Sequence, residues 1–142
     1  MATFISHSPA DTEHFGEQIA SGAERGSVIG LVGDLGAGKT QFVKGFARGL
    51  GVTEKVLSPS FAIVRVYTTG RIPLFHLDFY RLDTTDQIVA AGLEQYFAPD
   101  GVAIIEWWDR WQGPAPPNLL VFTLETVNEN DRRLKDNDDP GS

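Results

Sequence analysis

An eight-residue segment near the start of this 142-residue chain constrains its fold more than any other feature. Residues 33–40 read Gly-Asp-Leu-Gly-Ala-Gly-Lys-Thr and fit the phosphate-binding pattern G-x-x-x-x-G-K-[ST]. Its glycines are Gly33, Gly36 and Gly38. Glycines let backbone N–H groups curl closely around a phosphate, and the helix that follows points its positive dipole end at the same anion. The segment therefore predicts a P-loop in which Lys39 reaches the β and γ phosphates of a nucleoside triphosphate and Thr40 coordinates Mg²⁺.

The segments on either side of this loop have the periodicities that a P-loop requires. The apolar, β-branched run at 28–32 indicates a strand buried on both faces. After the loop, apolar residues recur at helical spacing from Phe42 to Leu50, and Gly51 is a plausible stop. We therefore expect the loop to join a buried strand to a helix.

The rest of the chain alternates between strand and helix patterns. Strands are expected at 61–67, 72–79, 102–105 and 119–127, and helices at 8–20 and 86–97. In the strand at 72–79, alternation places Leu74, His76 and Asp78 on one face. These patterns predict an α/β fold with an antiparallel pair near 61–79. We expect a single domain over residues 1–134 and a disordered polar tail at 135–142.

A phosphate-binding loop needs a carboxylate to hold the metal, usually at the end of a neighbouring buried strand. Glu106 closes the strand at 102–105, and Asp78 closes the apolar part of the strand at 72–79. We favour Glu106 because its strand is the more continuously apolar and so the more central. Both carboxylates could contribute, one of them through water.

Three side chains near these carboxylates are candidate switch residues. His76 shares a face with Asp78 and could orient its carboxylate or polarise an attacking water, although plain packing explains a strand histidine equally well. Ser60 lies between the P-loop helix and the next strand, where a hydroxyl can sense the γ-phosphate. Trp107 is the first of three tryptophans that closely follow Glu106. For these tryptophans gating, partner binding and ordinary packing all stay open.

The charge balance argues against direct nucleic-acid binding. The net charge is −7, from 19 acidic against 12 basic side chains, whereas proteins that grip nucleic acid present basic surface to the phosphates. There is no cysteine, and the N-terminal segment lacks the basic and apolar regions of a signal peptide. Apolar runs fall short of the roughly 20 residues of a membrane helix. We expect a cytoplasmic protein without membrane contact that reaches any nucleic acid through a partner.

Five segments, in their order and spacing, make the chain resemble the TsaE family, the small ATPases of bacterial tRNA threonylcarbamoyladenosine synthesis. They are GDLGAGKT at 33–40, SPSF at 58–61, HLDFYRL at 76–82, GLEQYF at 92–97 and IIEWW at 104–108. The resemblance runs from about Thr12 to Arg132. It implies a P-loop NTPase-type, three-layer α/β domain with a mixed, partly antiparallel sheet between helices, using ATP as substrate and Mg²⁺ as cofactor.

The resemblance also implies roles for individual residues. The ATP phosphates would be held by Gly36, Ala37, Gly38, Lys39, Thr40 and Gln41. The earlier loop residues Gly33, Asp34 and Leu35 are also expected to belong to the ATP site. The metal would be served by Thr40, Asp78 and Glu106, and hydrolysis by Lys39 with the two carboxylates. The adenine would lie between Pro9 and Arg132.

The switch segments of the family fall on Ser60, in the first, and on Trp107, which follows the acidic residue of the second. This chain departs from the usual family pattern at three positions. Ser60 replaces threonine but keeps the hydroxyl, Gln41 stands where a second threonine is frequent, and Trp108 replaces a frequent proline. None of these changes removes a group that the mechanism needs.

The activity implied is a slow ATPase that acts on the TsaB–TsaD heterodimer, whose TsaD subunit modifies the adenosine next to the anticodon. The tRNA would be reached only through these partners. No arginine finger is evident in the sequence, so we expect a partner to complete the site. The alternatives are a small-molecule P-loop kinase, for whose lid the chain has little room, and a nucleotide-gated binding module. A signalling GTPase is disfavoured because the chain has no N-K-x-D segment to read guanine.

Overall fold

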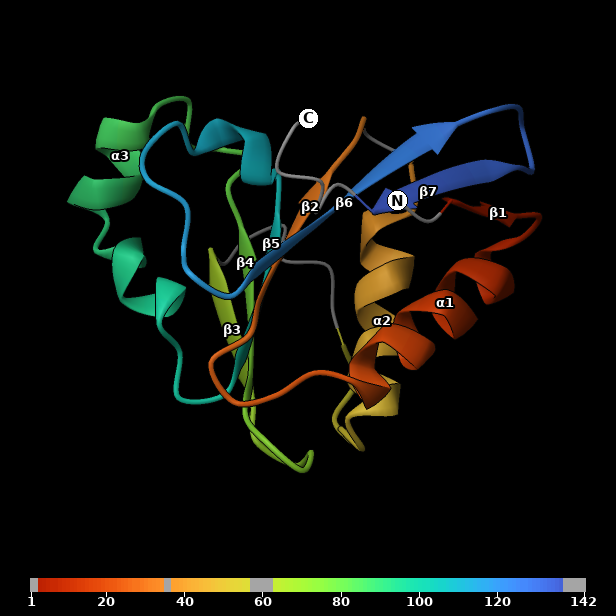
Figure 1. Cartoon of the computed structure of the whole chain (residues 1–142), viewed down its shortest axis with the longest axis horizontal. Helices are drawn as coiled ribbons and strands as arrows, with labels where there is room; N and C mark the ends of the chain where they lie inside the picture. Colours follow the sequence, from red (N-terminus) through yellow and green to blue (C-terminus); the bar gives the residue numbers. More distant parts are fainter. Residues whose placement is uncertain (1–2, 35–36, 57–62, 137–142) are drawn as a thin grey trace.

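A single sheet runs through the middle of the molecule (Figure 1). The computed structural model describes residues 3–34, 37–56 and 63–136. Within these residues the sheet has seven strands in the order β1-β7-β6-β2-β5-β4-β3. They are β1 (Thr3–Ser6), β2 (Val28–Val32), β3 (Val64–Tyr67), β4 (Leu74–Asp78), β5 (Val102–Glu106), β6 (Leu119–Thr126) and β7 (Arg132–Asp136). The strand before the glycine-rich loop, β2, therefore lies in the centre of the sheet.

The inner strands of the sheet are parallel and the outer ones antiparallel. β2 pairs in parallel with β5 and with β6, and β4 pairs in parallel with β5. β3 is antiparallel to β4, while β7 is antiparallel to both β6 and β1. The sheet is thus mixed, and the antiparallel pair expected near 61–79 is confirmed as β3 with β4. Residues 61 and 62 of the expected strand lie outside the described residues.

Helices cover both faces of this sheet (Figure 1). On one face lie α1 (Pro9–Ser21) and α2 (Lys39–Gly49), and on the other α3 (Thr85–Ala90) and the 3₁₀ helices η1 (Leu93–Phe97) and η2 (Trp108–Arg110). β2 and β5 read as continuous apolar runs because each is covered on both faces. In the described part of the chain, none of the helices has the length and apolar character needed to span a membrane.

The start of α1 and its contact with α2 follow from local sequence. The Ser8 side chain accepts a hydrogen bond from the Asp11 backbone N–H at 3.1 Å, and Pro9 occupies the first helical position. α1 then packs very closely on α2, since a Cβ at Gly45 would lie only 1.7 Å from the Glu13 carbonyl oxygen. The glycine therefore allows α1 to lie directly against the helix that follows the loop.

Three expectations about the elements need correction. The helix expected at 86–97 is two pieces, because Gly92 adopts a left-handed conformation (φ 75°) that ends α3 and starts η1. The strands β1 and β7 were not expected. The first two residues of the predicted disordered tail, Lys135 and Asp136, form the end of β7. Residues 137–142 lie outside the described part of the chain.

Candidate active site

The glycine-rich loop follows β2 directly and leads into the first turn of α2. Gly38, the residue before the helix, has φ +100°, a conformation that favours glycine. At Gly33 a Cβ would lie 2.4 Å from the Leu124 carbonyl oxygen of β6, so the loop passes too close to the sheet for a side chain. Leu35 and Gly36, both predicted to belong to the ATP site, lie outside the described residues. The free N–H groups of the α2 N-terminus make this end of the helix favourable for an anion.

Lys39, the first residue of α2, is almost buried, with 5% of its surface exposed. Its Nζ donates hydrogen bonds to the carbonyl oxygens of Gly33 at 2.5 Å and Asp34 at 2.7 Å. Burial lowers the pKa of this ammonium, and the nearby carboxylates Glu106 and Asp78 oppose that shift. The lysine is thus folded back over its own loop, with four acidic side chains close enough to act on its charge, Glu106 and Asp78 most strongly.

Glu106 ends β5 beside the first turn of α2. In the parallel register of β2 with β5 it lies opposite Leu31, one residue before the end of β2. Its side chain is on the α2 face, 4% exposed, and its Oε1 accepts a long hydrogen bond of 3.5 Å from the Thr40 hydroxyl. The favoured carboxylate thus lies beside the loop helix, and its role at a metal stays a prediction.

The second predicted carboxylate, Asp78, ends β4 directly opposite Glu106 in the parallel register. Its Oδ1 accepts a hydrogen bond from the Tyr80 backbone N–H at 2.9 Å. Burial is the largest influence on its pKa and raises it, and the negative charge of Glu106 adds to this shift. Two carboxylates thus lie side by side at the carboxyl ends of the neighbouring parallel strands β4 and β5.

His76 makes a different contact from the one expected. It is fully buried, and its Nε2 lies 2.6 Å from the Glu106 Oε2 atom. The hydrogen bond of this ring nitrogen therefore goes to Glu106, so among the roles left open for His76 a hydrogen bond to the Asp78 carboxylate is not the one observed. The opposite ring nitrogen, Nδ1, is buried and has no hydrogen-bond partner among the residues that the structure describes.

These oxygens fit the coordination habits of Mg²⁺. The ion prefers hard oxygen ligands and usually takes one or two from the protein, with water and substrate phosphates supplying the rest. The Thr40 hydroxyl and the Glu106 carboxylate lie within 3.5 Å of each other beside the loop, and Asp78 is the register neighbour of Glu106. Across the described ranges no group of three or more His, Asp or Glu side chains could hold a metal alone. A metal held partly by nucleotide phosphates suits this donor set.

Trp107 closes the site from the side of β5. It has a left-handed backbone (φ 59°), and its ring centroid lies 4.6 Å from the Lys39 Nζ atom and 5.1 Å from the Arg110 Cζ atom. Its ring also packs on Tyr80, with centroids 5.2 Å apart. Trp108, by contrast, is a core residue of the α3 side, 8% exposed. Trp108 and Trp111 therefore pack in the core, whereas Trp107 borders the site, and its gating or partner-binding role stays a prediction.

The two predicted adenine contacts come from distant parts of the chain, which the pairing of β1 with β7 brings to the same side of the sheet. Arg132 begins β7 and pairs with Ser6 of β1, three residues before Pro9. Thr12 of α1 approaches the loop, because a Cβ at Gly38 would lie 3.6 Å from the Thr12 methyl group. The start of α1 thus lies between the P-loop and the strand that carries Arg132.

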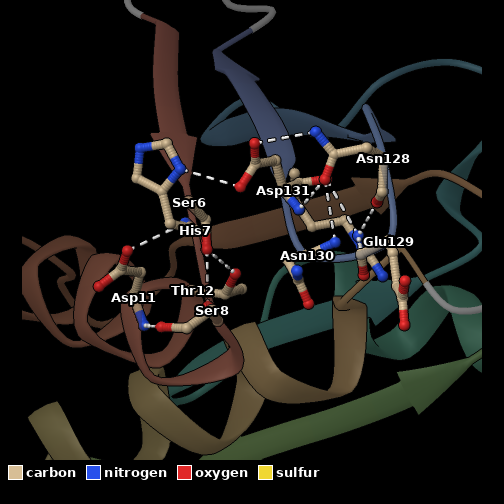
Figure 2. Close-up of polar contacts among 10 residues, drawn as sticks. Ser6, His7, Ser8, Asp11, Thr12, Asn128, Glu129, Asn130 and Asp131 are labelled. Atoms are coloured by element: carbon tan, nitrogen blue, oxygen red, sulfur yellow. Dashed lines mark hydrogen bonds and ion pairs between the residues drawn. The ribbon is translucent and has the colours of Figure 1, made fainter.

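A network of polar contacts joins the start of α1 to the β6–β7 turn (Figure 2). Figure 2 shows His7 and Asp131 pointing toward each other, with the His7 Nδ1 atom 2.9 Å from the Asp131 Oδ1 atom. The Ser6 and Thr12 hydroxyls lie 2.7 Å apart. Arg132 donates to three carbonyl oxygens of the turn, including that of Asn128 at 2.8 Å. Sequence reasoning missed this network because its members carry no motif and depend on the pairing of β1 with β7.

The remaining predicted site residues are placed as follows. Ala37 and Gln41 lie in the loop and the first turn of α2, beside Lys39 and Thr40. Ser60 lies outside the described residues, so its predicted switch role stays a prediction. Arg110, whose guanidinium lies 5.1 Å from the Trp107 ring centroid and also pairs with Asp83 at 3.2 Å, was not singled out from the sequence. Its place in the Trp-Trp-Asp-Arg-Trp segment gives no signal for that contact.

The fold and the site together define a class of protein. A central parallel strand, a glycine-rich loop of the P-loop pattern and a helix form one unit, with carboxylates at the ends of the neighbouring parallel strands. The chain is therefore an α/β protein whose loop of the P-loop sequence pattern lies at the carboxyl ends of the parallel strands of a mixed sheet. Within that class the family model described as "Threonylcarbamoyl adenosine biosynthesis protein TsaE" matches residues 6–134, and the chain belongs to this family.

Individual relatives agree with this assignment. The chain is 39% identical to the tRNA threonylcarbamoyladenosine biosynthesis protein TsaE of Bacillus subtilis (strain 168) over 126 residues, 89% of this chain and 78% of that protein. It is 37% identical to the protein of the same name from Treponema pallidum (strain Nichols) over 130 residues, 92% of this chain and 96% of that one. The crystal structure of YdiB from Bacillus subtilis superposes with a TM-score of 0.81 at 33% identity, covering 95% of this chain and 83% of that one. The resemblance inferred from the sequence motifs is confirmed.

Proposed function

We propose that this protein is a Mg²⁺-dependent ATPase of tRNA threonylcarbamoyladenosine biosynthesis that acts on a TsaB–TsaD complex. One observation carries the ATPase part of this proposal. Lys39, the Thr40 hydroxyl and the Glu106 carboxylate converge at the N-terminus of one helix, where a triphosphate and its metal would bind. Family membership supports the biosynthetic role.

The chemistry at this site would be attack of water on the γ-phosphorus of ATP. The bond from that phosphorus to the β–γ bridging oxygen breaks, giving ADP, inorganic phosphate and a proton. Lys39 would leave the Gly33 and Asp34 carbonyl oxygens and donate to the phosphates, where its charge stabilises the transition state. Bound Mg²⁺, held by Thr40 and Glu106, would neutralise charge on the phosphate oxygens. Asp78, the neighbour of Glu106, would accept hydrogen bonds from water in the same space.

The adenine would bind at the edge of the sheet, between the start of α1 and the β6–β7 turn. Support comes from the pairing of Ser6 with Arg132 and from the contact of His7 with Asp131, which bring these two segments together. Thr12, in the first turn of α1, lies close to Gly38 of the loop, so the base site and the phosphate site are neighbours. The triphosphate of one nucleotide could therefore reach the loop while its base lies against this edge.

Dependence on a partner follows from the charges that the site supplies. Among the described residues the cation identified at the phosphate end is Lys39, and Arg110 lies on Trp107 with its guanidinium already paired to Asp83. Hydrolysis by the isolated protein should therefore be slow, because a further positive group would be needed for the transition state. The net charge of −7 agrees with a protein that leaves the tRNA to its partners.

The test is ATP hydrolysis by the protein alone and with purified TsaB and TsaD. We expect strong stimulation by the pair, and loss of the stimulated activity in Lys39→Ala and Glu106→Ala. Lys44→Ala is the matched control, since it removes a lysine from the same helix, five residues beyond Lys39. Near-wild-type turnover by the Lys39 or Glu106 variant would remove that residue's role. ATP binding without stimulation, or multiple rounds of tRNA modification without hydrolysis, would refute the proposed function.

A further inference from the structure

We infer that His76 is a positioning residue for Glu106, fixing one carboxylate oxygen so that the other stays turned toward Thr40. This inference rests on the proposed role of Glu106 at the metal. The two oxygens of the carboxylate have different partners. Oε2 lies 2.6 Å from the His76 Nε2 atom, and Oε1 accepts from the Thr40 hydroxyl at 3.5 Å. The short contact is the buried one, and the long contact lies at the loop.

The geometry of the sheet explains how His76 reaches this carboxylate. β4 and β5 are parallel, and His76 lies opposite Ile104, two residues before Glu106 on the same face. The imidazole therefore reaches diagonally across the strand pair, and its outer nitrogen Nε2 meets Glu106. A carboxylate that binds a metal is ionised and only accepts hydrogen bonds, so in the proposed metal-binding state Nε2 would be the donor. Because the register of β4 on β5 is set by the whole sheet, this contact holds the glutamate against a rigid part of the fold.

Packing alone does not account for a histidine at this position. His76 is fully buried, and its Nδ1 atom has no hydrogen-bond partner within the described residues. A buried imidazole with one unsatisfied nitrogen is costly, whereas an apolar side chain would fill the space without that cost. The contact with Glu106 is the polar interaction that offsets the burial of this ring. The side chain is therefore best explained by what it does to Glu106.

His76 also keeps two buried charges apart. The charge of Glu106 raises the pKa of Lys39, and a flexible glutamate beside a lysine would tend to form an ion pair with it. In the structure the Lys39 ammonium donates to the Gly33 and Asp34 carbonyl oxygens, while Glu106 is held by His76. Because Lys39 and Glu106 have separate partners, the ammonium stays available to phosphate and the Glu106 Oε1 atom stays available to a metal.

Two substitutions separate this role from packing. In His76→Gln the amide nitrogen occupies a position like that of Nε2, so it can still donate to Glu106. In His76→Asn the amide nitrogen takes the place of Nδ1 and falls short of the carboxylate. Both variants remove the ring and lose similar packing, so they differ chiefly in the hydrogen bond to Glu106. Leu77→Val is a matched control, because it weakens packing from the same strand on the opposite face of the sheet.

The measurement is binding of Mn²⁺, as a spectroscopic substitute for Mg²⁺, to the protein with a non-hydrolysable ATP analogue. We expect His76→Asn to weaken Mn²⁺ binding by about 10- to 100-fold, as loss of an outer-shell partner typically does, and His76→Gln to recover most of it. Affinity for the analogue in EDTA should change little in both variants. Leu77→Val should lower the thermal midpoint without changing Mn²⁺ affinity.

The outcomes that contradict the inference are distinct from those that contradict the function. Equal Mn²⁺ affinity in His76→Asn and His76→Gln, or a loss that merely follows thermal stability as in Leu77→Val, would overturn the positioning role alone. The ATPase proposal would then stand. If the wild-type protein with the analogue binds no Mn²⁺, or binds it equally well after Glu106→Ala, the proposed metal site and this inference fall together.

Discussion

Gly30 lies at the centre of β2, where its lack of a side chain lets the Trp108 ring pack directly against the strand. A Cβ added at this position would lie 2.5 Å from Cγ and 2.8 Å from Cδ1 of the Trp108 ring. Carbon atoms in good contact are about 3.5–4.0 Å apart. The ring would therefore have to retreat by about 1 Å. It has little room, because it is 8% exposed and packs on Phe79 and Phe97.

Two opposing effects set the size of the change in Gly30→Ala. Alanine gains about 0.5–1 kcal/mol over glycine within a strand because it loses less backbone freedom on folding. Overpacking of a closely filled core costs about 1–3 kcal/mol. Since the clash is with a large and confined ring, we expect a net loss of about 1–2 kcal/mol. At a typical slope of about 2 kcal/mol per molar urea, the unfolding midpoint should fall by roughly 0.5–1 M.

The assay is urea unfolding of the wild type, Gly30→Ala and Gly22→Ala. Gly22 caps the end of α1 with φ −99°, and a Cβ there would meet its nearest atom, the Ile19 carbonyl oxygen, at an ordinary 3.9 Å. Gly22→Ala should therefore be neutral or stabilising. In a Trp108→Leu background the loss caused by Gly30→Ala should largely disappear. If Gly30→Ala is as stable as the wild type, or if its loss is unchanged in that background, the steric reasoning is refuted.

Two further predictions concern the edge of the sheet near α1. Arg132→Ala should weaken binding of ATP, measured by calorimetry, by more than it weakens binding of inorganic tripolyphosphate. The control Arg133→Ala, which removes the neighbouring pair with Glu125, should affect neither ligand. An equal loss for both ligands in Arg132→Ala would remove Arg132 from the base site. The hydrogen bond and charge of Asp131 raise the pKa of His7 above its ordinary 6.5. Because this pKa is raised in the folded state, the pair contributes stability that is fully present below pH 6.5 and is lost as the pH rises through the higher value. In Asp131→Asn the His7 titration followed by NMR should return toward 6.5, and an unchanged midpoint would contradict the contact.

The sequence was sufficient to predict the P-loop unit because that unit is local. The strand–loop–helix signal depends on residues within about twenty positions of one another, and its apolar periodicities match its burial. The break at Gly92 was missed because a single glycine inside a helical pattern does not show which backbone conformation it takes. β7 was missed because only Leu134 of its five residues faces the core, flanked by charged side chains.

The contacts of the candidate site were less predictable than its members. Periodicity placed His76 and Asp78 on one face of their strand. The alternation is confirmed, because Leu74 belongs to the core under α1 and α2 and Leu77 to the core under α3. Which carboxylate the imidazole meets depends on the register of β4 on β5, and that register is set by non-local pairing. Arg132 was assigned from the resemblance alone, and its nearness to the start of α1 depends on a strand pair that has no local signal.

The pairing of β1 with β7 bears on the order in which the chain can fold. Ser6 pairs with Arg132 and Thr3 with Lys135, so the first strand finds its partner only in the last one. β2 likewise has an open edge until β6 has been synthesised. On the ribosome, the strand–loop–helix unit at 28–49 can form early, whereas the edge proposed to hold the base must wait until Arg132–Asp136 has been synthesised. If the base binds there as proposed, nucleotide can act on folding through its base only after β7 has been synthesised.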